Sequence, residues 1–286
     1  MPTKRKARQM QISFEVYPPR KEEDTPKLHE AILRLTELDP KFISVTFGAG
    51  GSSSRDSLSV LKFIRDNSTA SPLAHLTCVG TTEADAKELL GEFLGEGISD
   101  FLALRGDLPE GQTHMPPGTL SRADQLVKLI GDARGEKKGI TAVAAFPNGH
   151  PESGNDRSDI AALLAKQEAG ASFAITQLFF FAEDYLNFVD LARCRGVTID
   201  LIPGIMPIVS STRLARVLEL TGEREPEQLA KGLGQAEDAA SRREVGIDWA
   251  ASQTRELADA GVDAVHLYAF NEYANVTEVL KRAGVV

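Results

Sequence analysis

The stretch ISFEVYPPRKEEDTPKLHEAILRLTELDPKFISVTF, residues 12–47, reads as one strand–helix–strand unit. Its ends, 12–17 and 42–47, are short runs rich in β-branched and aromatic residues, whereas 25–38 has the longer apolar pattern of a helix. A helical crossover of this length joins parallel strands. The segment therefore predicts that the chain opens with a parallel βα repeat.

The same alternation continues along the rest of the chain. Further strands are expected at 73–79, 100–105, 140–146, 173–180, 199–205 and 263–269. Helices are expected at 54–67, 82–96, 120–134, 158–170, 182–195 and 212–222, with two more within 223–260, the second containing Trp249, and a closing helix at 274–284. Eight βα units predict a single-domain (βα)8 TIM barrel over residues 11–286, after a flexible basic tail at 1–10. An open doubly wound sheet is the alternative.

Composition narrows the class of protein. A net charge of −9 argues against a nucleic-acid partner, which would need clustered lysines and arginines. No apolar run approaches the roughly 18 residues that cross a membrane. The two cysteines, Cys78 and Cys194, lie far apart and fit neither a disulfide framework nor a zinc site, so we expect a cytoplasmic protein without a structural metal.

Glu15 is the first candidate for chemistry. Because side chains alternate along a strand, Phe14 and Val16 share one face of the first strand and Glu15 lies on the other, which we expect to face the barrel interior. Desolvation there would raise its pKa and keep it protonated, as a general acid at neutral pH requires. The alternative is a structural carboxylate paired with Arg20 or another rim arginine.

Asp107 is the second candidate, in the sequence RGDLP at 105–109. The loops that follow the strands of a parallel barrel gather at one rim, where function concentrates. The turn would hold Asp107 over the barrel mouth, where a carboxylate can stabilise a cation. A turn-capping aspartate bonded to nearby backbone amides is an equally good interpretation.

Other polar residues at strand ends have weaker claims. His75 lies within an apolar strand and is more readily explained as a core histidine. His150, in a loop with proline and glycine, is better placed for ligand contact, although a solvated turn would also explain it. Gln177 could offer its amide to a heterocycle or be satisfied by backbone. The aromatic run 179–181 is attributed to the core, and the loop GAGGSSS at 48–54 is only a weak phosphate-binding signal.

Two kinds of active site are disfavoured by what the sequence lacks. No predicted strand ends in lysine, which disfavours Schiff-base chemistry, and no HExxH or similar metal-spaced cluster occurs.

The strings SFEVYPPR, FISVTFGAGG, HLTC, ALRGDLP, HPE, AGASFAITQLFF and IPGIMP occur in this order, and together they resemble the methylenetetrahydrofolate reductase family. The resemblance spans nearly the whole chain. It implies a (βα)8 barrel with FAD at its rim, where NADH or NADPH reduces the flavin and then leaves for methylenetetrahydrofolate, in ping-pong order. The methylene group bridges two nitrogens of the folate, so the ring must open to an iminium before hydride reaches the carbon.

The resemblance also implies residue roles. Glu15 would be the acid that promotes ring opening, Asp107 would hold the pterin and stabilise the iminium, and Gln177 would bind the pterin edge. Flavin contacts would come from Thr46, His75, Arg105, Gly106, Asp107, Phe146, His150, Asp159 and Lys166. A homo-oligomer is a further expectation by analogy.

Three departures from the family pattern stand out. Phe270-Asn271-Glu272 replaces the usual Leu-Asn-Arg, so an arginine near the substrate is missing. Ser210-Ser211 stands where some relatives place an aromatic that stacks on the nicotinamide dinucleotide, and Phe146 replaces a tyrosine. Two alternatives therefore remain: flavin-free transfer of hydride directly from NAD(P)H to folate, and a non-catalytic folate- or flavin-binding subunit.

Overall fold

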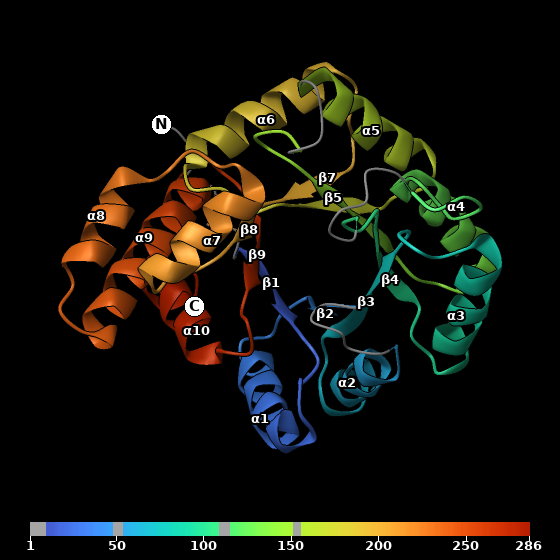
Figure 1. Cartoon of the computed structure of the whole chain (residues 1–286), viewed down its shortest axis with the longest axis horizontal. Helices are drawn as coiled ribbons and strands as arrows, with labels where there is room; N and C mark the ends of the chain where they lie inside the picture. Colours follow the sequence, from blue (N-terminus) through green and yellow to red (C-terminus); the bar gives the residue numbers. More distant parts are fainter. Residues whose placement is uncertain (1–9, 48–53, 109–114, 151–155) are drawn as a thin grey trace, which may run out of the picture.

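The computed structural model describes residues 10–47, 54–108, 115–150 and 156–286. Its strands all pair in parallel, in the order β7-β6-β5-β4-β3-β2-β1-β9-β8, and the helices surround them (Figure 1). The strands are β1 Gln11–Val16, β2 Phe42–Val45, β3 Ser71–Thr77, β4 Asp100–Leu104, β5 Thr141–Ala145, β6 Phe173–Thr176, β7 Asp200–Ile202, β8 Gly204–Ile205 and β9 Ala264–Tyr268.

The helices fall close to their predicted positions. They are α1 Thr25–Thr36, α2 Ser54–Asn67, α3 Glu83–Gly95, α4 Ala123–Arg134, α5 Asp156–Glu168, α6 Ala182–Cys194, α7 Ser211–Thr221, α8 Glu227–Gln235, α9 Ala239–Asp259 and α10 Tyr273–Ala283, with a short 3-10 turn at Glu22–Asp24. The two helices expected within 223–260 are α8 and α9. Of the predicted tail at 1–10, only Met10 belongs to the described residues, and it is buried.

The single strand expected at 199–205 is wrong in detail, because Pro203 divides it into β7 and β8. Proline has no N–H to give to a sheet, and the two pieces pair on opposite sides, β7 with β6 and β8 with β9. The backbone N–H of Gly204 instead donates to Thr176 Oγ1 at 2.9 Å, and Pro203 O accepts from His266 N at 2.9 Å. The two short strands follow each other in the chain and bring the ends of the sheet together into a nearly closed barrel, which confirms the TIM-barrel prediction over the open sheet.

The strand expected at 173–180 is also too long, since β6 ends at Thr176. The chain then turns outward. Leu178 and Phe180 are buried against α7 and α8 in a separate apolar cluster, and Phe179 is buried in the main core. The assignment of the 179–181 aromatics to the core is thereby confirmed for Phe179 and Phe180.

The period-2 alternation of the strands creates two cores. Outward side chains such as Phe14 and Ile43 pack in the large core with the helices. Inward side chains fill the barrel with a second apolar cluster of Phe42, Leu73, Leu102, Ala142 and Ile175. Four other inward side chains, on β1, β2, β3 and β9, are polar and buried, and together they are called the polar wall: Ser13, Ser44, His75 and His266. This polar wall lies below the site.

The described helices include none that combines the length and apolar character needed to cross a membrane.

Candidate active site

One large cavity opens where the carboxyl ends of the strands meet. Its volume of about 1810 Å³ exceeds the roughly 300–1,000 Å³ of a typical small-ligand pocket, so it has room for two flat ring systems. All of the residues that the sequence nominated line it: Glu15, Thr46, His75, Arg105, Gly106, Asp107, Phe146, His150, Asp159, Lys166 and Gln177. The fold therefore brings them together, although their roles remain predictions.

Glu15 faces the cavity from β1, as the strand alternation predicted. Its side chain is 19% exposed, and burial raises its pKa to about 8. Its Oε2 lies 3.5 Å from His75 Nε2. In the described part of the chain no arginine pairs with it, so the structural ion pair with Arg20 is not formed there. Glu15 is consequently protonated at neutral pH, which suits a proton donor.

The polar wall beneath Glu15 holds two neutral histidines. Burial lowers the pKa of both His75 and His266 to about 3, and the charge that His75 would carry adds to the effect on His266. Ser13 Oγ lies 2.9 Å from His266 Nδ1. Tyr268 donates to Thr176 O at 2.8 Å, and its pKa is raised by burial and by Glu15. No charge on this wall stabilises a Glu15 carboxylate.

Asp107 follows β4 on a fixed turn. The N–H groups of Cys78 and Val79 both donate to Arg105 O at 3.0 Å, and Gly106 has a φ of +83° that favours glycine. A Cβ on Gly106 would lie 3.1 Å from Thr77 Cβ, so the close approach also requires glycine. Asp107 itself is exposed in the cavity, and the described residues form no hydrogen bond to its carboxylate. The turn-capping interpretation is not supported there.

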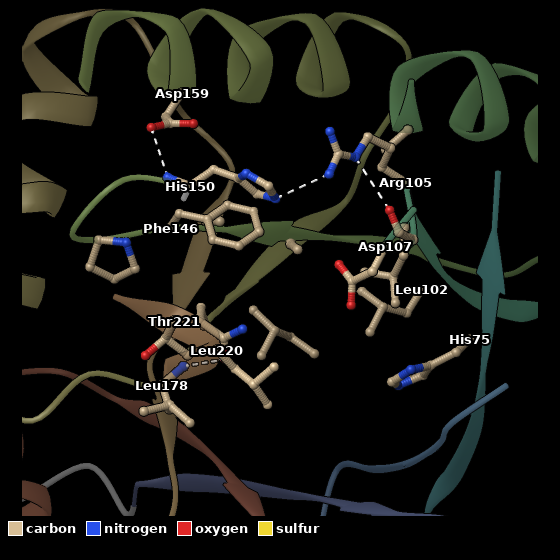
Figure 2. Close-up of a pocket in the computed structure, with 18 of the residues that line it drawn as sticks. His75, Leu102, Arg105, Asp107, Phe146, His150, Asp159, Leu178, Leu220 and Thr221 are labelled. Carbon is tan, nitrogen blue, oxygen red and sulfur yellow. Dashed lines mark hydrogen bonds between the residues drawn. The ribbon is translucent and has the colours of Figure 1, made fainter. Parts of the chain in front are cut away.

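A second polar group lies at another part of the cavity, where Arg105, His150 and Asp159 approach one another (Figure 2). Arg105 Nη2 and His150 Nε2 are 3.5 Å apart, and the backbone N–H of His150 donates to Asp159 Oδ2 at 3.1 Å. Lys166 donates to Ala144 O at 2.9 Å, and burial lowers its pKa to about 8, against the opposing effect of Asp159. The Phe146 ring meets His150 edge to face at 4.7 Å. This set of donors can bind phosphate oxygens.

Uncharged donors and acceptors complete the lining. Gln177 Oε1 accepts from Leu178 N at 2.9 Å, which orients the amide and leaves its NH₂ for a ligand. Thr46 Oγ1 and His75 Nε2 are buried and have no hydrogen-bond partner among the described residues. Buried polar atoms are normally paired, so these two atoms favour a ligand with polar ring atoms.

The lining includes residues that the sequence analysis did not single out, and three of them are Tyr268, Arg213 and Arg122. Tyr268 shares the inward face of β9 with His266, an alternation visible in 263–269. Arg213 enters from the first turn of α7, with its guanidinium carbon 5.0 Å from the centre of the Phe270 ring. A basic residue at the positive end of a helix was the available signal. Arg122, the third, pairs with Asp124 at 2.6 Å.

The remaining features are the glycine-serine loop at 48–54 and the absence of a predicted metal site. The glycine-serine loop, apart from Ser54, belongs to the undescribed stretch 48–53. Among the described ranges no group of three or more histidine, cysteine, aspartate or glutamate side chains is arranged to hold a metal ion.

Comparisons with known proteins show which family the chain belongs to. A family model for methylenetetrahydrofolate reductase matches residues 2–284. The 5,10-methylenetetrahydrofolate reductase of Escherichia coli (strain K12) is 35% identical over 264 residues, covering 92% of this chain and 87% of the relative. A probable methylenetetrahydrofolate reductase (NADPH) of Caenorhabditis elegans is 32% identical, covering 97% of this chain and 43% of the relative.

A solved structure supports the fold. It is an uncharacterized protein from Clostridium thermocellum that binds two copies of 5-methyl-5,6,7,8-tetrahydrofolic acid. It has a TM-score of 0.63 at 13% identity and covers 97% of this chain and 95% of its own. At that identity the likeness shows the barrel alone. The family match and the bacterial relative go further: this chain is an enzyme that belongs to the methylenetetrahydrofolate reductase family.

Proposed function

We propose that this chain reduces methylenetetrahydrofolate to methyltetrahydrofolate through bound FAD, with NADH or NADPH as the hydride donor. The observation that carries the proposal is Glu15, a protonated carboxyl at the wall of a cavity large enough for two flat rings. Family membership supports the overall reduction. The bound flavin, the nicotinamide donor and the roles of individual residues are what we propose in addition to that reduction.

The lining fits FAD. Arg105, His150 and Lys166 offer positive charge and N–H donors for a pyrophosphate. The unpaired Thr46 Oγ1 and His75 Nε2 suit the polar edge of a flavin ring. When bound, FAD would accept hydride from the nicotinamide and pass it to the folate.

Glu15 supplies the proton for ring opening. The bond between the methylene carbon and one folate nitrogen breaks, that nitrogen takes the Glu15 proton, and the carbon becomes part of an iminium cation. Asp107, exposed in the cavity, places a carboxylate where it offsets the positive charge. The NH₂ of Gln177 donates to the pterin edge, which holds the ring in place for hydride transfer.

Absorbance spectroscopy tests the flavin. The purified chain, after incubation with FAD and removal of free flavin, should keep visible flavin bands that NADH or NADPH bleaches without oxygen and methylenetetrahydrofolate restores. Steady-state double-reciprocal lines should be parallel. A colourless but active protein with intersecting lines would instead establish direct transfer between the two substrates and overturn the flavin step.

Two further proposals have narrower support. A cytoplasmic location is consistent with two free cysteines, Cys78 and Cys194. A homo-oligomer rests on analogy alone, and sedimentation of the purified chain would test it.

A further inference from the structure

Arg213 is a cation on the cavity lining that lacks a carboxylate partner. It is the third residue of α7, and its N–H donates to the capping hydroxyl of Ser210 at 3.2 Å. No carboxylate in the described ranges pairs with its guanidinium. By contrast, Arg216, one turn further along α7, pairs with Glu219 at 2.6 Å.

Arg213 lies in the first turn of α7, where a positive charge is unfavourable without an anion nearby. The amino end of a helix carries partial positive charge, so a cation in the first turn is unfavourable there, and α7 has no acidic residue in that turn to compensate. Both the helix end and the guanidinium would gain from an anion in the cavity. The amino end of α7 and the Arg213 guanidinium together therefore indicate that an anionic group of a ligand binds here.

The surface under Arg213 is fixed by the backbone. Phe270 has a φ of +48° and Asn271 a φ of +60°, a left-handed conformation that is unusual for residues other than glycine. The side chain of Asn271 holds it in place, accepting from Tyr17 N at 3.0 Å and donating to Tyr17 O at 2.9 Å. The Phe270 ring thus stays beneath the guanidinium, 5.0 Å from its carbon. Strain retained in this way is typical of a functional site.

We propose that Arg213 binds a carboxylate of the glutamyl tail of the folate and so acts as a specificity residue. This inference rests on the proposed function. A folate is long, with a pterin at one end and carboxylates at the other. With the pterin near Glu15 and Gln177, which lie at strand ends, the acidic tail extends toward the mouth, where Arg213 is only half-buried.

A dinucleotide phosphate is the other anion that could reach Arg213. The cavity already offers phosphates a separate set of donors, the cations Arg105 and Lys166 with the imidazole of His150. Arg105 follows β4, His150 follows β5 and Lys166 belongs to α5, whereas Arg213 belongs to α7. The division favours the folate tail as the partner of Arg213.

The test compares two ligands that differ only in the tail: methyltetrahydrofolate, and methyltetrahydropteroate, which lacks the glutamate. The pteroate keeps one carboxylate, but it is attached directly to the benzoyl ring and lies closer to the pterin than the glutamate carboxylates do. Dissociation constants are measured by calorimetry for the FAD-incubated wild type and for Arg213→Gln. The wild type should prefer the folate by roughly 10- to 100-fold, because a charge-assisted pair is lost with the tail. Arg213→Gln should bind both ligands about equally, at the wild-type affinity for the pteroate. Arg213→Lys should recover part of the preference.

Arg216→Gln is the matched control, because Arg216 also lines the cavity from α7 but its guanidinium is already paired with Glu219. It should leave the ratio of the two constants unchanged. A ratio that survives in Arg213→Gln, or a wild type that binds both ligands equally, would overturn the assignment while leaving the reductase function intact. An Arg213→Gln defect confined to NADH or NADPH affinity would overturn it in favour of a dinucleotide phosphate. A wild type that binds neither pterin would overturn the proposed function as well.

Discussion

Oε2 of Glu15 lies 3.5 Å from Nε2 of His75, and neither group is charged at neutral pH. Burial raises the pKa of Glu15 to about 8 and lowers that of His75 to about 3. Moving the proton from Glu15 to His75 would create two charges in a desolvated place, and their attraction does not offset that cost. The contact is therefore not an ion pair, and the proton stays on the carboxyl that faces the cavity.

Glu15→Gln should stop the folate half of the reaction. The amide has nearly the same shape but no proton to give, so reoxidation of the reduced flavin by methylenetetrahydrofolate should slow by about 100-fold or more. Reduction of the flavin by NADH or NADPH should change little, because it needs no proton from Glu15. Stopped-flow absorbance separates the two halves. Glu30→Gln, at an exposed glutamate of α1 that does not line the cavity, is the control, and normal folate turnover in Glu15→Gln would remove the acid role.

The pH dependence of the same step follows from the raised pKa of Glu15. The carboxyl is protonated below about pH 8, so the rate of flavin reoxidation by folate should be level there and fall tenfold for each pH unit above it. The fall should be absent from flavin reduction by the nicotinamide. A folate step that instead loses rate below pH 6 would show that the active form is the carboxylate.

The free energy of unfolding should also depend on the protonation of Glu15. Below pH 4.5, the ordinary pKa of glutamate, Glu15 is protonated in both the folded and the unfolded chain. Between pH 4.5 and about pH 8 it is protonated only in the folded chain, so its contribution to the free energy of unfolding decreases as the pH rises through this range. Near pH 7 the cost is on the order of 3 kcal/mol. Glu15→Gln lacks this cost, so its stability advantage in urea unfolding should grow from about pH 5 to about pH 8 and then level off. A constant difference across that range would contradict the raised pKa.

The sequence predicted the parallel barrel because apolar strands and amphipathic helices alternate, and this pattern is local. It also nominated residues at strand ends, since a barrel brings those ends to one rim. It could not show that Pro203 divides the seventh strand, because the pairing of β7 with β6 and of β8 with β9 depends on the closed barrel. Nor could it place Arg213 on Phe270, residues far apart in the chain that meet through a left-handed turn.

Gly106→Ala should damage the turn that presents Asp107. The methyl group would lie 3.1 Å from Thr77 Cβ and 3.2 Å from Val79 Cγ2, at a φ of +83° that alanine adopts poorly. We expect a loss of about 1–3 kcal/mol in the free energy of unfolding and weaker FAD retention, because Arg105 adjoins the displaced residue. Gly131→Ala, in the interior of α4 with open space around the new methyl, should gain up to about 1 kcal/mol. Equal effects at both sites would show that the Gly106 turn adapts.

Gln177 tests whether an oriented amide recognises the pterin. Because its Oε1 already accepts from Leu178 N at 2.9 Å, the NH₂ group is the part left for the substrate. Gln177→Ala removes that donor, and Gln177→Glu keeps an acceptor for Leu178 N but replaces the donor with a carboxylate. Both should weaken methyltetrahydrofolate binding, by about 10-fold for alanine and by more for glutamate, because the carboxylate places an acceptor opposite an acceptor of the pterin.

Calorimetry with methyltetrahydropteroate should show the same losses of affinity, since Gln177 acts on the ring and not on the tail. If Gln177→Glu bound as tightly as the wild type, the pterin would have to donate to residue 177, and the orientation of the ring in the cavity would be the reverse of the one proposed.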